Sequence, residues 1–278
     1  MSDNYKNFFL KLFQVIALLL FASYMFIPFL WMFATTMRPP VEAFKWPPQI
    51  LPTEFNFTSY RTVFEKVDFP KFIWNSVFIS VGSTILVLFS SSLAAFTFAR
   101  LKFKGSNVIF IIFLMAMMIP GQVLGIPNFI IMSKLGLVDT HAALILPRLF
   151  NAFAIFLIRQ FMLTIPISYD EAARIDGANS FYIYSRIVVP MVKPALLTVA
   201  LQTFIATWND FYGPLIFLNT ESKMTLPIGL TALNGMLGSG NQSSLIAGVL
   251  LSLIAPVIFY LIGQNVLMEG INIGGVKA

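Results

Sequence analysis

Six apolar stretches, each long enough to cross a lipid bilayer, set the fold class of this chain. A helix that rises about 1.5 Å per residue crosses the roughly 30 Å hydrocarbon layer in about 20 residues. Blocks of that length run at about 12–33, 72–98, 107–132, 142–163, 188–217 and 245–267. This spacing predicts an all-α, polytopic membrane protein, in which residues 1–278 form one domain with six transmembrane helices.

The composition agrees with a chain that is mostly embedded in lipid. Of the 278 residues, 58% are hydrophobic and 11% are charged, whereas soluble proteins have about 45–50% and about 25%. The net charge of +6 is spread over the gaps between the apolar blocks and forms no basic run, which argues against nucleic acid as a partner. The first block is too long for a signal-peptide core and has no small-residue cleavage site before its end, so we expect a retained helix.

The basic residues between the blocks predict the orientation, because positive charge accumulates on the cytoplasmic side. The short connection at 100–104 decides the assignment, since it holds a cluster of three basic residues. The short connections on the other side hold little more than Lys134, Arg148 and Lys223. We therefore expect both termini in the cytoplasm and the proline-rich stretch 38–53 outside.

The segment between the fourth and fifth blocks is longer than a helix hairpin requires, and its residues predict two short helices. Ser168 and Glu171 stand at capping-box spacing, which predicts a helix that starts near Tyr169. Gly177 is suited to the left-handed residue that ends a helix. Asn179 or Ser180 can then begin a second helix toward Pro190.

Two roles are open for this cytoplasmic segment. It could be an amphipathic hairpin that rests on lipid headgroups, or it could dock onto a protein. The first helix offers alanines and acidic residues instead of a broad apolar face with lysines, and such a surface fits anionic lipid poorly. A protein partner is therefore the favoured interpretation.

The segment resembles the EAA loop of ABC importer permeases. That loop has the pattern EAA, three residues, G, nine residues and I-x-L-P, and the chain has Glu171-Ala172-Ala173, Gly177 and Ile187-Val188-Val189-Pro190, with Val189 in place of leucine. The remainder is similar to carbohydrate-importer permeases of the maltose-transporter type. The similar segments include "WNSVFIS" (74–80), "AAFTFARLKFKG" (94–105), "AIFLIRQF" (154–161) and "TWNDFYGPLIFL" (207–218).

The resemblance implies a type I ABC importer transmembrane domain in the inner membrane, which carries a carbohydrate. Its implied partners are a second, homologous permease, an ABC ATPase dimer and an extracytoplasmic solute-binding protein. The loop at 164–190 would be the coupling helix that sits in a groove of the ATPase. The residues implied in that contact are Glu171, Ala172, Ala173, Asp176, Gly177, Ile187 and Pro190.

Several polar residues inside the apolar blocks are candidates for a substrate path. Ionisable and amide groups at membrane depth usually face a cavity or a partner. The candidates are Gln122, Asn151, Trp208, Asn209, Asp210 and Tyr212. Asp210 could instead gate or anchor the external mouth, and a single amide such as Gln122 or Asn151 is more often an interhelical hydrogen-bond partner.

The chain lacks the sequence patterns of an enzyme. No GxxxxGK[ST] phosphate loop is present, so ATP and Mg²⁺ would be bound by the partner ATPase and this chain would need no cofactor of its own. A single histidine, His141, and no cysteine give no basis for a metal site. The competing function is a proton-coupled secondary transporter of small solutes, although Asp210 is the only clear acid within a block. A structural membrane scaffold is a third class.

Overall fold

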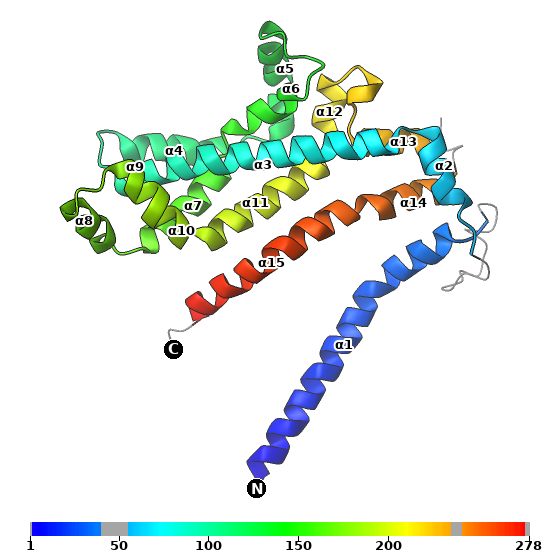
Figure 1. Ribbon diagram of the computed structural model, residues 1–278, viewed down its shortest axis with the longest axis horizontal. Helices are drawn as coiled ribbons and strands as arrows, with labels where there is room; N and C mark the ends of the chain where they lie inside the picture. The colour runs from blue at the N-terminus through cyan, green and yellow to red at the C-terminus, as the bar shows by residue number, and fades with distance from the viewer. Residues whose placement is uncertain (1, 40–54, 235–240, 276–278) are drawn as a thin grey trace. The chain divides into compact units, whose positions relative to one another are not determined.

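The computed structural model describes residues 2–39, 55–234 and 241–275, and it divides into two units that are considered in turn. All regular structure in these ranges is helical (Figure 1), which confirms the predicted all-α fold. Most of the proline-rich stretch that we predict to be external, residues 40–53, lies outside the described residues.

The first unit comprises Met1–Val67 and Leu230–Leu251. It contains α1 (Ser2–Thr36), α2 (Thr58–Lys66), the end of α13 (Leu226–Asn234) and nearly all of α14 (Gln242–Ser252). The side chains of α1 are exposed over most of its length, as expected for a helix that faces lipid or another subunit. The Thr36 hydroxyl lies 2.9 Å from the Tyr60 hydroxyl and thereby joins α1 to α2.

The second unit, Asp68–Gly229 with Ser252–Ala278, is built around α3 (Phe69–Arg100). Asp68 caps this helix by accepting a hydrogen bond from the Lys71 N–H. α3 packs along α7 (Ala152–Thr164) and α11 (Lys193–Trp208), and α11 also packs against α15 (Ile254–Gly275). Small side chains permit this close approach. Those buried on α3 are Ser76, Ser80, Ser83, Ser91, Ser92 and Ala95.

The other elements of the second unit are short. They are α4 (Ser106–Ala116), η1 (Gly121–Leu124), α5 (Gly125–Lys134), α6 (Ala142–Ile145), η2 (Leu146–Leu149), α8 (Ser168–Ile175), α9 (Ser180–Tyr182), η3 (Ile183–Val188), α10 (Val189–Met191), α12 (Tyr212–Phe217) and η4 (Glu221–Lys223). η3 is a π-helix, a form that is rare and is frequent at functional sites.

Only three of the predicted spans are single helices of sufficient length, and the other three are broken. The continuous ones are Asn7–Thr36, Phe69–Arg100 and Gln242–Gln264. The helices bend by 97° between α4 and α5, by 43° between η2 and α7, and by 78° between α10 and α11. The described chain has six apolar segments if each bent pair crosses once, so the number of crossings stays a prediction.

The largest departure from the predicted spans lies in the block at 188–217. We expect one helix there, but the helix bends at Val192 and ends at Trp208. Pro190 and Pro194 flank the bend, and proline cannot donate the backbone hydrogen bond that a continuous helix needs. A separate short helix, α12, follows from Tyr212 to Phe217.

Gly229 allows α13 to approach α3. A β-carbon at this position would overlap the ring of Phe72, which is 2% exposed and cannot move aside. We therefore expect Gly229→Ala to destabilise the protein by about 1–3 kcal/mol through overpacking. The measurement is the midpoint of thermal unfolding of purified protein. Adding Phe72→Leu should recover part of the loss, and an unchanged midpoint in Gly229→Ala would contradict this packing.

Candidate functional site

The segment that resembles the EAA loop forms a compact hairpin, residues 168–191, beside the C-terminal end of α3 (Figure 1). Its first helix, α8, starts at Ser168, close to the predicted start. The predicted capping box is wrong, because Ile167 occupies the cap position and no side chain caps the helix. Backbone contacts begin the helix instead: the N–H groups of Asp170 and Glu171 both donate to the carbonyl of Ile167, at 2.9 and 3.1 Å.

The turn of the hairpin follows the sequence prediction. Gly177 has φ of 84°, in the left-handed region, and its N–H donates to the Arg174 carbonyl at 3.0 Å. The next N–H, of Ala178, donates to the Ala173 carbonyl at 2.9 Å, which completes a Schellman motif. Asn179 then caps the second helix by accepting from the Tyr182 N–H at 2.8 Å.

The predicted coupling residues are divided between two faces of the hairpin. Glu171, Ala172, Asp176, Gly177 and Pro190 are exposed. Ala173 is 9% exposed and packs in a core with residues of η3, and Ile187 is half-buried against the same core. The alanine pair therefore does not present one surface, since consecutive residues of a helix point in different directions.

Large apolar side chains on the hairpin were missed by the sequence analysis. Ile175 is 87% exposed and Phe181 is 67% exposed. Tyr182 is also exposed, and it lines a hollow of about 530 Å³ together with Asp176 and Arg186. The available signal was the large apolar side chain of Ile175 in the last turn of a short helix that is rich in polar residues and alanine. The hairpin therefore exposes large apolar side chains next to the acidic residues Glu171 and Asp176.

The opposite face of α8 is tied to α3 by charge. Nε of Arg100 lies 3.5 Å from Oδ2 of Asp170, and the two side chains are only 4% and 3% exposed. Arg100 also donates from Nη2 to the Ile165 carbonyl at 2.9 Å. Arg100 belongs to the basic cluster from which we predict the orientation, but the structure gives its guanidinium a buried partner.

A second region of the same unit holds a polar cavity of about 460 Å³. It brings together Gln122, Asp210 and Tyr212 of the predicted substrate path and adds Asn128 and Arg148. Arg148 donates from Nη2 to Oδ2 of Asp210 at 2.7 Å, and both side chains are about a quarter exposed, at 26% and 23%. From the sequence, Arg148 is expected in an external connection. The signal for its role was the position of an arginine inside the apolar block at 142–163.

Two backbone contacts fix the arrangement around Asp210. Oδ1 of Asp210 accepts the Gly213 N–H at 3.0 Å, at the start of α12. The Tyr212 hydroxyl donates to the Gln122 carbonyl at 3.3 Å and so joins α12 to η1. A β-carbon at Gly125 would lie 2.6 Å from the Tyr212 hydroxyl, so a larger residue there would displace this hydroxyl.

The other predicted path residues lie elsewhere. Trp208 is 4% exposed and stacks on Phe204, with ring centroids 5.9 Å apart, so its indole is not available in this chain as a face for a sugar ring. Asn209 is exposed and donates to the carbonyl of Ile205. Asn151 caps α7 by accepting from the Ala154 N–H at 2.9 Å. Because α11 ends at Trp208, Trp208 and Asn209 do not line the same cavity as Asp210 and Tyr212.

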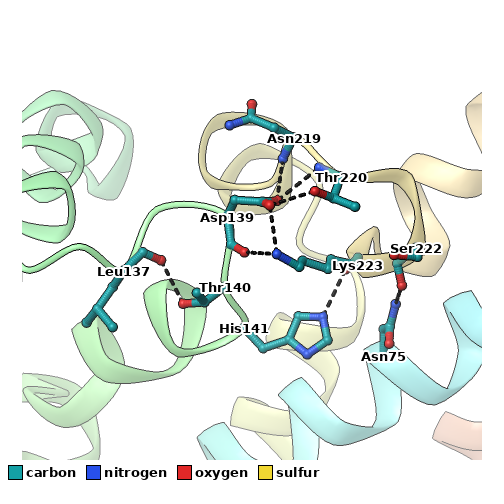
Figure 2. Close-up of polar contacts among 9 residues, drawn as sticks. All are labelled: Asn75, Leu137, Asp139, Thr140, His141, Asn219, Thr220, Ser222 and Lys223. Carbon is teal, nitrogen blue, oxygen red and sulfur yellow. Dashed lines mark hydrogen bonds and ion pairs between the residues drawn. The ribbon is translucent and has the colours of Figure 1, made fainter.

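Figure 2 shows a cluster of polar contacts that joins the loop before α6 to the loop after α12. Oδ1 of Asp139 accepts the N–H groups of Asn219 and Thr220, both at 2.9 Å. Oδ2 accepts the Thr220 hydroxyl at 2.6 Å and Nζ of Lys223 at 2.7 Å. The His141 ring lies 2.9 Å from the Lys223 carbonyl, so this side chain also joins the two loops.

The contacts of Asp139 hold its pKa far below the usual range. The ammonium of Lys223 is the largest cause, followed by the hydroxyl and N–H of Thr220 and the N–H of Asn219. Asp139 adopts φ of 60°, a left-handed conformation that is uncommon for residues other than glycine. Because the two loops lead into α6 and α12, this cluster positions two walls of the polar cavity.

Comparison with known proteins decides the family. Residues 87–267 match the model of the "Binding-protein-dependent transport system inner membrane component" family. The chain belongs to this family. The membership confirms the resemblance, and together with the apolar helices it makes the chain a multi-pass permease of the inner membrane.

Relatives of the permease match over most of its length. The arabinooligosaccharide transport system permease protein AraQ of Bacillus subtilis is 34% identical, over 81% of this chain and 80% of the relative. The trehalose transport system permease protein SugB of Mycobacterium tuberculosis is 30% identical, over 93% and 94% of the two chains. A chain in the crystal structure of a bacterial ABC transporter involved in alginate import has a TM-score of 0.80 at 25% identity, over 92% of the permease and 96% of that chain.

The Asp139 cluster predicts a pH-dependent stability. A carboxyl whose pKa is lower in the folded than in the unfolded state stabilises the fold above its unfolded value of about 3.9, and this contribution declines as the pH falls toward the folded pKa. Asp139→Asn should therefore lower the midpoint of thermal unfolding of the permease at pH 7. The difference in unfolding midpoint between this variant and the wild type should become smaller as the pH falls below about 4.

The control for this measurement is Glu65→Gln. Glu65 pairs with Arg61 in an exposed contact on one helix, and such pairs contribute little to stability. The unfolding midpoint of Glu65→Gln should therefore match that of the wild type both at pH 7 and below about pH 4. A gap for Asp139→Asn that stays constant from neutral to acid pH would contradict the role of the carboxylate.

Proposed function

We propose that the permease forms half of the translocation path of an ATP-driven importer of carbohydrates. Family membership supports the transport role and the dependence on a solute-binding protein. The sugar class is supported by the relatives, which are named for arabinooligosaccharide and trehalose transport. Residues 1–278 would act as one transmembrane domain with six crossings, and a homologous permease would supply the other half of the path.

The exposed edge of the hairpin carries the proposal that ATPase closure is transmitted through this chain. Glu171 and Ala172 face outward from a helix whose inner face is fixed, and Ile175 projects beside them with 87% of its surface exposed. A partner that covers this edge needs a basic group for Glu171 and an apolar recess for Ile175. An ABC ATPase dimer would provide this groove and would hold the ATP and Mg²⁺, so the permease itself needs no cofactor.

The proposed orientation follows from the same assignment. The hairpin and both termini lie on the cytoplasmic side, where the ATPase is. The loops joined by the Asp139 cluster then lie on the opposite side, where a solute-binding protein would deliver its ligand. Transport requires the path to open alternately to the two sides.

The polar cavity is the proposed point at which this chain contacts the solute. The Arg148–Asp210 pair offers N–H donors and carboxylate acceptors side by side, and neighbouring sugar hydroxyls need both. The competing proton-coupled carrier is disfavoured, because the family is binding-protein-dependent and Asp210 is engaged by Arg148 and the Gly213 N–H.

Changes on the exposed edge of the hairpin should abolish transport without preventing insertion. Glu171→Lys reverses the charge that faces the ATPase. Gly177→Asp places a side chain at φ of 84°, which distorts the turn. We expect solute uptake by cells to fall to background while the permease stays in the membrane at wild-type amounts. Glu65→Lys on α2 is the matched control, and normal uptake by both hairpin variants would refute the coupling role.

Asp210→Asn tests the cavity. The amide keeps the shape of the side chain but loses the charge that faces Arg148, which weakens the pair and any solute held by it. We expect the KM for uptake to rise by about tenfold, with an unchanged amount of assembled importer. Uptake kinetics equal to those of the wild type would show that the cavity does not contact the solute.

A further inference from the structure

The contact between Arg100 and Asp170 is unusual among the ion pairs of the described residues. Three other ion pairs of the described residues have side chains that are between 23% and 80% exposed, whereas the side chains of Arg100 and Asp170 are 4% and 3% exposed. Neither carboxylate oxygen of Asp170 accepts a hydrogen bond in the described structure, and neither does Nε of Arg100 donate one. The guanidinium at 3.5 Å is therefore what compensates the buried charge of Asp170.

Stability alone is a poor explanation for such a pair. A buried ion pair contributes little net stability compared with apolar residues of the same size, but removal of one partner leaves an uncompensated charge. The pair therefore strongly favours one packing arrangement of α8 against α3 over arrangements in which either helix is shifted. Such a preference suits a contact between two helices that must keep their relative position while one of them is displaced.

The pair continues a row of contacts along α3. Ser92, Phe96 and Arg100 are spaced four residues apart and so lie on one face of the helix. The Ser92 hydroxyl lies 2.7 Å from the Tyr184 hydroxyl in a buried contact, and the rings of Phe96 and Tyr184 are 5.4 Å apart. The hairpin is thus joined to α3 through both α8 and the π-helix η3.

The other end of α3 is fastened to the loop after α12. Nδ2 of Asn75 donates to the carbonyls of Ser222 and Met224, at 3.0 and 2.9 Å. The Leu226 N–H donates to the Ser76 hydroxyl at 2.8 Å. One helix of 32 residues, about 48 Å long, therefore links the hairpin to the loops of the Asp139 cluster.

We propose that Arg100 and Asp170 are positioning residues that make α3 move together with α8. A displacement of the hairpin by the ATPase would then reach the opposite face of the membrane through α3, and not only through the spans that flank the hairpin in the sequence. This proposal rests on the proposed function, because it assumes that the ATPase moves α8. It adds a route by which the motion is conveyed.

The test uses the assembled importer in lipid nanodiscs, with both permeases, the ATPase and the solute-binding protein. Trp74 is exposed near the start of α3, and the chain has no cysteine, so Trp74→Cys provides a single reactive thiol in this subunit. The probe is the rate of maleimide modification of that thiol, first without nucleotide and then after trapping with ATP, Mg²⁺ and vanadate.

We expect trapping to change the modification rate about threefold or more when the pair is intact. In Arg100→Gln or Asp170→Asn the change should disappear, because the remaining buried charge has no partner and the contact between α8 and α3 is weakened. Exchanging the charges, with Arg100→Asp and Asp170→Arg in one protein, should restore at least part of it. Arg61→Gln, which removes one partner of an exposed pair, is the control and should behave as the wild type.

A nucleotide-dependent change that survives in the single variants, per assembled importer, would overturn the proposal and leave the pair a purely structural contact. If the single variants do not assemble, the charge-exchanged protein decides, and its failure to assemble or to respond would also overturn the proposal. The proposed function is tested separately by Gly177→Asp. Normal transport by both Gly177→Asp and Glu171→Lys would refute the coupling role of the hairpin. If these variants are uncoupled while the Arg100 and Asp170 variants keep the nucleotide-dependent change, only the role of Arg100 and Asp170 is refuted.

Discussion

The buried contact between Arg100 and Asp170 is the interaction on which this account of the permease depends. It joins the first turn of α8 to the last turn of α3, and it does so where neither charge can be satisfied by water. With its inner face fixed in this way, α8 presents Glu171, Ala172 and Ile175 outward. The exposed edge of the hairpin and the helices of the second unit are thereby parts of one packed structure.

The same helix connects the two candidate sites. α3 packs along α7 and α11, and near its N-terminus it bonds the loop that carries Lys223. That loop is bound to Asp139, and the two loops lead into walls of the polar cavity. A movement of α8 that carries α3 with it would therefore act on the cavity through hydrogen-bonded contacts, although α8 and the cavity are built from separate elements.

The sequence predicted the fold class and the hairpin because both depend on local patterns. Apolar block length indicates membrane helices, and Gly177 and Asn179 end and begin helices through contacts with residues close in the chain. Two failures were local, namely the capping box at Ser168 and the bend beside Pro190 and Pro194; the others depend on contacts between residues that are distant in the sequence. The positions of Ala173 and Arg148 are set by contacts with residues on other helices. The helix breaks at Val192 and Trp208 moved Asp210 away from the helical series in which the sequence placed it.

The most direct test of the account is the distance between α3 and α8 during the ATPase cycle. Spin labels at Ile85→Cys on α3 and Tyr169→Cys on α8, both exposed positions, report this distance by pulsed electron paramagnetic resonance in the assembled importer. The account predicts the same distance distribution without nucleotide and after vanadate trapping, because the two helices move as one body. A shift of several ångströms between the two states would show that α8 moves independently of α3 and would contradict the account.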